Sequence, residues 1–425
     1  MSANHEITLR SRAWFGDHNL TLKCPENWDI RVYRMKDAGP VGEDEIENAL
    51  SNPIGTRSLS DLAKEKESAV IIVDDLSRAT PANLVIPYIL EALKQSGIED
   101  ESIRFVIGGG AHRPLTSEEM GKKIGEEVAK KYEVHNHNVF SGTLRALGNL
   151  EDGTPVYLND IVAASDLKIA ISGVVPHGGA GFGGGAKLIL PGVVGAVTIA
   201  YNHGSGAYKG RGRGNIERQD EEKDMRDHME DVARYVGLDF SVNLVLNSER
   251  GIAGIYAGDF IEAHRAAAGL AKEVYETDMP KGEMENTDIA VINAYPLDAA
   301  SEQLGKSSWP QGIFENAHKV MIDPALDGVC YHGLYGDYRV DFETFLKLKT
   351  KEPKVERKPE INAKDGLVLL TESFPVADFY KKYPEGALFN RWENLAGQLQ
   401  EIYPTSRKVR VAVIPCSPIQ LPNTK

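Results

Sequence analysis

The chain has 425 residues, 42% of them hydrophobic and 26% charged, a composition and length typical of a globular protein with two or three domains. Its formal net charge of -14 argues against nucleic acid or an anionic membrane as a partner, because both favour clustered Lys and Arg. Three widely spaced cysteines, no signal-peptide pattern and no run of the ~20 apolar residues of a membrane span predict a cytoplasmic protein without a disulfide framework.

Short apolar runs alternate with segments of helical period from residue 68 onward, which is the pattern of parallel strands joined by crossover helices. The first predicted strand spans residues 68–75 and leads into a helix, for which Pro81 suits the first turn and Gly97 the end. Further strands are predicted at residues 103–107 and 167–171. The fold class is therefore α/β with a parallel, Rossmann-like sheet.

Each of these three predicted strands ends in polar residues. Asp75 and Arg78 follow the first strand, His112 follows the second, and His177 follows the third. Ligands bind at the carboxyl edge of open parallel sheets. Turns are polar in most proteins, so one such strand end is weak evidence. Three together predict a binding or catalytic site.

A glycine-rich segment follows the third strand, with 8 glycines among the 18 residues from 178 to 195. Its exposed backbone N–H groups could bind a phosphate, although a tight loop between closely packed backbones is an equally good interpretation. Lys187 lies within the segment, and His203 ends a helix predicted at residues 193–202. Histidine is a common ligand of nickel, zinc and copper and a common acid or base, but it is also a frequent packing residue.

These elements, taken in order, resemble the lactate racemase family, whose cofactor is a nickel-pincer nucleotide. The shared pattern is Asp-x-x-Arg after a strand, a Gly-x-His-Arg-Pro turn, Pro-His with Lys ten residues later, and Asn-His. The corresponding residues here are Asp75 with Arg78, His112 with Arg113 and Pro114, Pro176 and His177 with Lys187, and Asn202 with His203.

The resemblance implies a racemase or epimerase of a 2-hydroxy acid that uses nickel and pyridinium-3,5-bisthiocarboxylic acid mononucleotide. Lys187 would hold this cofactor through a thioamide, and His203 would bind nickel. His112 and His177 would be the two acid/base residues. The partners would be the 2-hydroxy acid and the biosynthetic proteins that supply the cofactor.

The other predicted site residues fall into two groups. Those that would support the cofactor are Asp75, Gly183, Gly184 and Gly185. Those that would bind the substrate are Arg78, Gln303 and Lys306, the last two resembling the family's Gln-x-x-Lys on one face of a helix. Arg78 suits a carboxylate because guanidinium binds it through two hydrogen bonds, and Asp75 is expected to orient Arg78 or a histidine.

The chemistry of inversion agrees with these roles. The C2 hydrogen of a 2-hydroxy acid is too weakly acidic for an ordinary side-chain base to remove as a proton. A route through the 2-keto acid needs a base for the hydroxyl proton and an electron-poor acceptor for hydride. Two enantiomers present their hydroxyls from different directions, so two histidines on separate strand ends meet the need.

The chain departs from the family pattern in two places. The family typically has Ser-Gly-Gly-Arg before the attached lysine, whereas residues 183–186 read Gly-Gly-Gly-Ala. It commonly has Gly-Thr-His where residues 110–112 read Gly-Ala-His. The loss of the Ser and Arg side chains leaves the phosphate contacts and the covalent link to Lys187 open, and both departures allow a 2-hydroxy acid other than lactate as the substrate.

Two domains are expected, with the active site in the cleft between them. The N-terminal domain would span residues 1–276, and a polar, turn-rich linker would span residues 277–286. A smaller α/β domain at residues 287–425 would close over the cleft. Its predicted strands are residues 289–293, 319–323, 366–370 and 409–414.

Two other functions fit the same residues. A zinc-dependent hydrolase could use His177 and His203 to bind the metal and a water nucleophile. A non-catalytic protein could keep the glycine-rich loop to bind a nucleotide. The cationic segment with Lys209, Arg211 and Arg213 could recognise a second carboxylate, although a solvated loop is the simpler interpretation.

Overall fold

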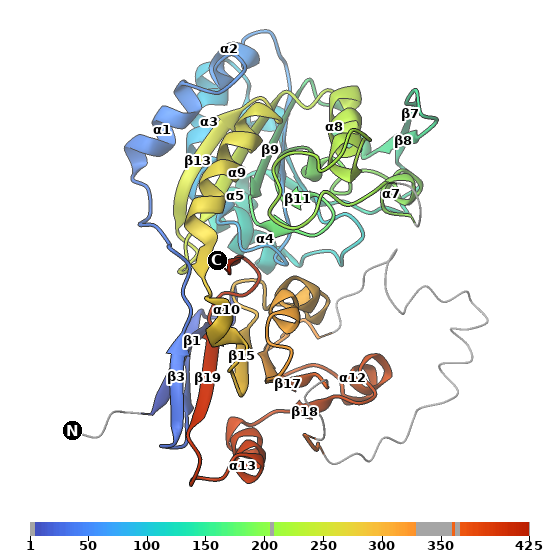
Figure 1. The fold of residues 1–425 in the computed structure, drawn as a ribbon. Helices are drawn as coiled ribbons and strands as arrows, with labels where there is room; N and C mark the ends of the chain where they lie inside the picture. The colour runs from blue at the N-terminus through green and yellow to red at the C-terminus, as the bar shows by residue number, and fades with distance from the viewer. Residues whose placement is uncertain (1–4, 205–207, 329–358, 362–365, 425) are drawn as a thin grey trace. The chain divides into compact units, whose positions relative to one another are not determined.

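The computed structural model describes residues 5–204, 208–328, 359–361 and 366–424. The chain forms two compact units (Figure 1). The central unit contains residues 37–274. The terminal unit combines residues 5–36 with the described residues from 275 onward. Among the described residues, no helix is both long and apolar enough to cross a membrane.

The central unit is built on a six-stranded sheet with the order β13-β12-β9-β4-β5-β6. All its strands are parallel except β13, which pairs antiparallel with β12. Numbered along the chain from β4, the spatial order is 3-2-1-4-5-6, that of a doubly wound nucleotide-binding fold. The strands are β4 (Ala69–Val73), β5 (Ile103–Ile107), β6 (Glu133–Asn136), β9 (Leu167–Gly173), β12 (Phe240–Leu246) and β13 (Ile252–Gly258).

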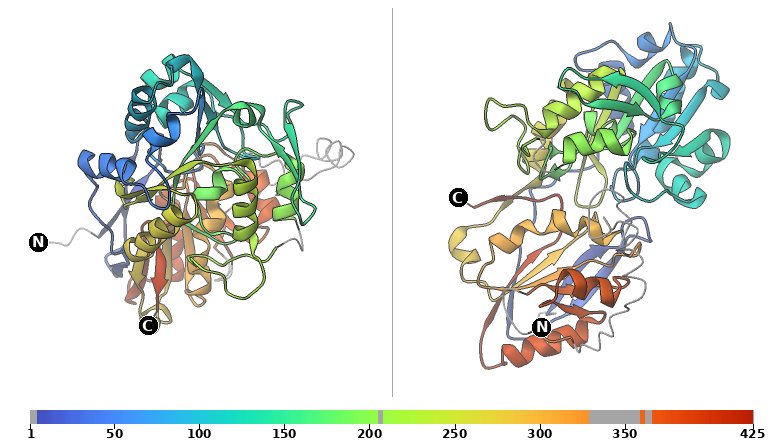
Figure 2. Two further views of the ribbon diagram at one scale, coloured as in Figure 1. Left: turned by 90° about the horizontal axis from the view of Figure 1, so that it is seen from above. Right: turned by 90° about the vertical axis from the view of Figure 1, so that its right-hand side faces the viewer.

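Helices lie on both faces of this sheet (Figures 1 and 2), so its inner strands are buried on both sides. This explains why β4 reads as a continuous apolar run rather than an alternating pattern, and why even Ser241 and Asn243 of β12 are buried. The helices are α1 (Glu43–Ser51), α2 (Leu59–Ala63), α3 (Ile86–Gln95), α4 (Ser117–Ile124), α5 (Glu126–Lys131), α6 (Asp160–Ala164), α7 (Ala196–His203), α8 (Met225–Val236) and α9 (Glu262–Tyr275), with 3-10 turns η1 (Ala82–Leu84), η2 (Asp100–Ser102) and η3 (Gly185–Leu188). Two antiparallel hairpins complete the unit: β7 (Arg145–Asn149) with β8 (Pro155–Leu158), and β10 (Pro176–His177) with β11 (Gly181–Phe182).

The terminal unit has its own six-stranded parallel sheet, in the order β18-β17-β16-β15-β19-β3. The strands are β3 (Trp28–Val32), β15 (Ile289–Asn293), β16 (His318–Ile322), β17 (Val368–Leu370), β18 (Ala387–Phe389) and β19 (Val409–Ile414). The core on one face gathers Trp28, Trp392 and aliphatic side chains of the strands. The unit also contains the hairpin β1 (Glu6–Ser11) and β2 (His18–Lys23), the pair β14 (Glu276–Asp278) and β20 (Leu421–Asn423), α10 (Lys281–Met284), α12 (Val376–Lys382), α13 (Trp392–Ile402), η4 (Ser301–Ser307) and η5 (Trp309–Gly312).

The strands predicted from the sequence are present, and the α/β class with two parallel sheets is confirmed. The boundary expected at residue 276 is close to the observed one, but residues 5–36 belong to the terminal unit. The reason is that β3 pairs in parallel with β19, so the chain starts in one unit and returns to it. The expected linker at 277–286 contains α10 and most of β14 rather than an irregular segment.

Candidate active site

Three loops follow the carboxyl ends of adjacent parallel strands of the central sheet. The loop after β4 carries Asp75 and Arg78, the loop after β5 carries His112, and the segment after β9 runs from His177 to Lys187. The order of strand connections reverses between β4 and β9, since the chain runs from β4 outward to β5 and β6 on one side and later continues from β9 to β12 on the other. Ligands of open parallel sheets bind at the carboxyl ends of the strands at such a point. The topology thus brings together the strand ends that the sequence singled out.

The buried carboxylate of Asp75 contacts the partly exposed ring of His112. His112 Nδ1 lies 2.6 Å from Asp75 Oδ2, and the backbone N–H of Ser77 donates to Asp75 Oδ1 at 2.7 Å. Burial alone would raise the pKa of Asp75, but its interactions with His112, the positive charge of Arg78 and the hydrogen bond from Ser77 hold it well below its usual value. Asp75 is therefore an ionised acceptor in contact with Nδ1 of His112.

Arg78 is placed by its own turn and by a buried lysine. Its Nη1 donates to Ser77 Oγ at 2.8 Å. From α4, Lys123 Nζ donates to the carbonyl oxygens of Asp75 and Arg78, each at 3.2 Å, and forms an ion pair with Asp74. Lys123 is 0% exposed. It fixes the backbone of the turn that presents both Asp75 and Arg78.

His177 ends strand β10 of a short hairpin. Its Nδ1 accepts hydrogen bonds from the backbone N–H groups of Gly179 at 3.2 Å and Ala180 at 3.1 Å. The ring is partly exposed. The turn that follows His177 therefore determines how this ring is held.

Three side chains from other elements form hydrogen bonds with the backbone of the glycine loop of residues 183–185. His264 Nε2 donates to the carbonyl oxygen of Gly183 at 2.8 Å, Arg226 Nη1 donates to that of Gly184 at 3.0 Å, and Gly185 N–H donates to Asn243 Oδ1 at 2.9 Å. Both Gly184 and Gly185 have positive φ, 86° and 55°. A Cβ on Gly185 would lie 2.9 Å from Arg226 Nη2 and 2.7 Å from the Phe260 carbonyl oxygen, so glycine is required there.

The guanidinium of Arg226 belongs to a buried charge network. Arg226 Nε donates to Glu230 Oε1 at 2.8 Å, and Arg265 binds the same carboxylate through two nitrogens at 2.8 and 3.0 Å. Burial and the two guanidiniums hold the pKa of His264 well below its usual value, so its ring is neutral and Nε2 carries the hydrogen given to the loop. The network thus holds the positive charge of the Arg226 guanidinium against the backbone of the glycine loop.

Lys187 follows this loop in η3, and part of its surface stays accessible. Burial, reinforced by the positive charges of Arg78 and Arg226 and only partly opposed by Asp75, lowers the pKa of Lys187 from 10.5 to about 7. Near neutral pH a substantial fraction of the amine is therefore uncharged. An uncharged amine is the form that can attack a carboxyl-type carbon.

The other predicted residues lie on separate elements. His203 occupies the last turn of α7, which ends at Gly204 as expected. No group of three or more His, Cys, Asp and Glu side chains in the described part of the chain is placed to hold a metal ion. Gln303 and Lys306 lie in the terminal unit, on the 3-10 helix η4, where Lys306 Nζ donates to Gln303 Oε1. This contact confirms that the two side chains share a face.

Comparison with known proteins identifies the family. The lactate racemase N-terminal domain matches residues 15–213, which include every predicted site residue of the central unit. A lactate racemase from Lactiplantibacillus plantarum is 32% identical over 329 residues, covering 75% of each chain. The chain belongs to the lactate racemase family. Its enzyme class is therefore isomerase, which argues against the hydrolase and the non-catalytic binding protein.

Another curated relative and two solved structures are also similar to this chain. A lactate racemase from Thermoanaerobacterium thermosaccharolyticum is 30% identical over 311 residues, covering 71% of this chain and 68% of that protein. The structure of the lactate racemase apoprotein from that organism matches with a TM-score of 0.71 at 23% identity, covering 98% of this chain and all of that one. A protein from Thermotoga maritima matches with a TM-score of 0.62 at 17% identity, covering 92% of this chain and all of that one. These likenesses show that the fold is shared.

One expectation about this lactate racemase homologue needs correction. The segment with Lys209, Arg211 and Arg213 is not simply a solvated loop, because Arg211 is only 2% exposed. Its guanidinium binds Asp224 through two nitrogens at 2.7 and 3.0 Å and reaches Asp227 at 2.8 Å. Lys209 is exposed and pairs with surface carboxylates, as the simpler interpretation expected.

Four positioning residues of this family member were missed in the sequence: Lys123, Arg226, Glu230 and His264. The charged residues look like ordinary surface positions of amphipathic helices, and only their spacing relative to apolar neighbours signals burial.

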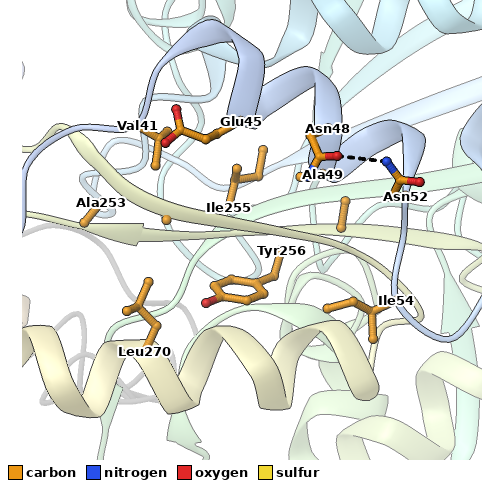
Figure 3. Close-up of a pocket in the computed structure, with 12 residues that line it drawn as sticks. Val41, Glu45, Asn48, Ala49, Asn52, Ile54, Ala253, Ile255, Tyr256 and Leu270 are labelled. Atoms are coloured by element: carbon orange, nitrogen blue, oxygen red, sulfur yellow. Dashed lines mark hydrogen bonds between the residues drawn. The ribbon is translucent and has the colours of Figure 1, made fainter.

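The structure also has an opening of about 370 Å³ between α1, β13 and α9, with Tyr256 and Leu270 among its walls (Figure 3). None of the predicted site residues lines it.

Proposed function

We propose that this protein racemises a short 2-hydroxy acid through its 2-keto acid, with a nickel-pincer nucleotide bound at Lys187. The observation that carries the proposal is the position of Lys187. A lysine with a lowered pKa follows a glycine loop, beside Arg78 and the Asp75–His112 pair. Lactate is the first substrate to test because the relatives named above are lactate racemases.

The residues present fit the proposed cofactor. At Gly185 a Cβ would meet Arg226 and the Phe260 carbonyl oxygen, so glycine lets the loop backbone lie directly against the Arg226 guanidinium, whose buried Nη2 lacks a hydrogen-bond partner among the described residues. The positive charge of Arg226 lies behind that loop and suits a phosphate. Lys187 would hold the pyridinium group through a thioamide, and His203 would be the protein's ligand to nickel. When bound, the group would supply an electron-poor acceptor for the C2 hydride.

Side chains of this protein would bind the substrate and transfer the hydroxyl proton. Arg78 would bind the substrate carboxylate, because its guanidinium is already oriented by Ser77. His112 and His177 would exchange the hydroxyl proton, and Asp75 would stabilise the imidazolium formed on His112. Gln303 and Lys306, which share a face of η4, would also bind the substrate.

The test is to express the protein together with the cofactor-making enzymes and to combine three measurements. The Lys187 peptide should gain the mass of the cofactor, the protein should contain nickel, and one enantiomer of lactate or a related 2-hydroxy acid should racemise. The control is Lys187→Ala prepared in the same way. An unmodified Lys187 peptide, no nickel and no racemisation of any acid in a panel would overturn the proposal.

A further inference from the structure

The two proposed acid/base histidines are held in opposite tautomers. Asp75 is an ionised carboxylate, and a carboxylate can only accept a hydrogen bond. Because His112 Nδ1 lies 2.6 Å from Asp75 Oδ2, the hydrogen must reside on Nδ1 of His112. In the neutral ring Nε2 therefore carries the lone pair, as in other aspartate–histidine pairs that act as bases.

His177 is held the other way round. Backbone N–H groups can only donate, and those of Gly179 and Ala180 both point at His177 Nδ1. Nδ1 must therefore be an acceptor, and in the neutral ring the hydrogen lies on Nε2. A proton on Nδ1 would meet both N–H hydrogens.

The 208–214 loop fixes the turn that creates this arrangement. The N–H of Arg211 donates to the Gly179 carbonyl oxygen at 2.7 Å, and the N–H of Gly212 donates to that of Gly178 at 3.1 Å. In a trans peptide the carbonyl oxygen and the N–H of the next residue point in opposite directions. Holding the carbonyl oxygens of Gly178 and Gly179 therefore directs the N–H groups of Gly179 and Ala180 toward His177. Arg211 is itself locked by its buried ion pairs with Asp224 and Asp227.

We propose that Arg211 is a positioning residue that holds His177 as an Nε2–H donor, so that in this conformation only His112 can accept the substrate's hydroxyl proton. The inference rests on the proposed function, because it assigns different roles to its two histidines. It gives the cationic segment a role that its sequence did not reveal. It also makes the site asymmetric, whereas the sequence suggested two equivalent bases.

The proton transfer follows from this assignment. The hydroxyl O–H bond breaks, an N–H bond forms at His112 Nε2, and the resulting imidazolium is balanced by Asp75. His177 Nε2–H donates a hydrogen bond to the substrate oxygen and polarises it, as neutral histidines do in other isomerases. For His177 to accept a proton at Nε2, its other hydrogen would have to move to Nδ1, which requires the 178–180 turn to shift.

The experiment is an NMR measurement on the cofactor-free protein labelled with ¹⁵N-histidine. Long-range ¹H–¹⁵N correlations near neutral pH distinguish protonated from unprotonated ring nitrogens. The 11 histidines of the chain would be assigned through single variants such as His112→Asn, His177→Asn and His135→Asn. His177 should show an unprotonated Nδ1 and a protonated Nε2, and His112 should show a protonated Nδ1.

Variants test the role of Arg211 itself. Arg211→Lys should shift the His177 signals toward an average of both tautomers and leave those of His112 in place. Asp224→Asn loosens the same anchor if the first variant does not fold. Lys209→Ala is the matched control, because this cation lies in the same loop but is exposed and should leave every histidine unchanged.

Two results would overturn the inference: a wild-type His177 with its hydrogen on Nδ1, or a wild-type His177 spectrum in both the Arg211 and Asp224 variants. Either can be separated from failure of the proposed function, because the spectra need neither cofactor nor turnover. The expected tautomers in a protein that racemises nothing when loaded would contradict only the proposed function. Reversed tautomers in an active racemase would contradict only this inference.

Discussion

Arg226 Nη1 donates a hydrogen bond of 3.0 Å to the carbonyl oxygen of Gly184, and the same guanidinium lowers the pKa of the nearby Lys187. One side chain of α8 therefore shapes the glycine loop and tunes the amine that follows it. The family typically has an arginine at the position of Ala186, and here that position is buried and small. Positive charge reaches the loop from a neighbouring helix instead.

Replacing Arg226 should separate these two effects. Arg226→Met removes the charge, so the pKa of Lys187 should rise from about 7 toward its usual value of 10.5. Arg226→Lys keeps the charge, so the pKa should change less, although the loop loses hydrogen bonds. The measurement is the pH dependence of Lys187 acylation by a small amine reagent, read by peptide mass. Equal reactivity profiles for the Met variant and the wild type would show that Arg226 does not tune Lys187.

Gly185→Ala should damage the loop without changing any charge. Its φ of 55° disfavours a side chain, and the new Cβ would meet the Phe260 carbonyl oxygen at 2.7 Å. We expect a loss of about 2–3 kcal/mol in the free energy of unfolding, since strained backbone costs about 1–3 kcal/mol at a single position. Gly142→Ala is the control, because a Cβ there has nothing within 4 Å. Denaturant unfolding of both variants checks this, and equal midpoints would contradict it.

The sequence was sufficient to predict three of the six strands of the central sheet and four of the six strands of the terminal sheet, and the spacing of Thr116 and Glu119 is the local signature of the capping box that begins α4. These signals are local: an apolar run of five residues, or a threonine three residues before a glutamate. The pairing of Trp28 with Val409 was not predictable in the same way. It joins distant parts of the chain, so no window of sequence contains it.

The residues of the candidate site also divide into those that the sequence predicts and those that only the fold reveals. Asp75, His112 and His177 were predictable because parallel strands deliver their carboxyl ends to one edge. Lys123 and Arg211 were not, because a charged residue in the sequence looks solvated until the fold buries it. The opposite tautomers of the two histidines depend on hydrogen bonds to a carboxylate and to backbone N–H groups, which only the folded chain places.

Lys123→Met should destabilise the protein strongly. It leaves Asp74 buried without its cation, and breaking a buried ion pair in this way costs about 3–5 kcal/mol. The double variant Lys123→Met with Asp74→Asn should recover part of the loss. Lys122→Met is the matched control on the same helix, since its pair with the exposed Glu118 should contribute less than about 1 kcal/mol. Similar losses for the two single variants in urea unfolding would refute the argument.

Lys187→Met should stabilise the cofactor-free protein in a pH-dependent way. The folded pKa of Lys187, about 7, lies below the unfolded value of 10.5, so folding opposes the charged amine. This cost is full below pH 7 and disappears as the pH rises toward 10.5. The variant should exceed the wild type by a few kcal/mol at pH 6, since one pKa unit corresponds to about 1.4 kcal/mol. A gap that is constant from pH 6 to pH 9.5 would contradict the lowered pKa.

Asp75→Asn should reduce activity and stability together, with a defined pH dependence. The neutral amide cannot stabilise the His112 imidazolium or fix its tautomer, so racemisation by the loaded enzyme should fall by about 10²–10⁴-fold.

The pKa of Asp75 is lowered in the folded state, so the carboxylate contributes stability above its unfolded pKa of about 4 and loses that contribution as the pH falls further. The variant should therefore be less stable than the wild type at pH 7, and the difference should shrink below about pH 4. Asp61→Asn, which changes an exposed carboxylate paired with Lys64, should change the free energy of unfolding much less than Asp75→Asn does. A stability difference for Asp75→Asn that persists unchanged in acid would show that the buried pair with His112 is not the source of the effect.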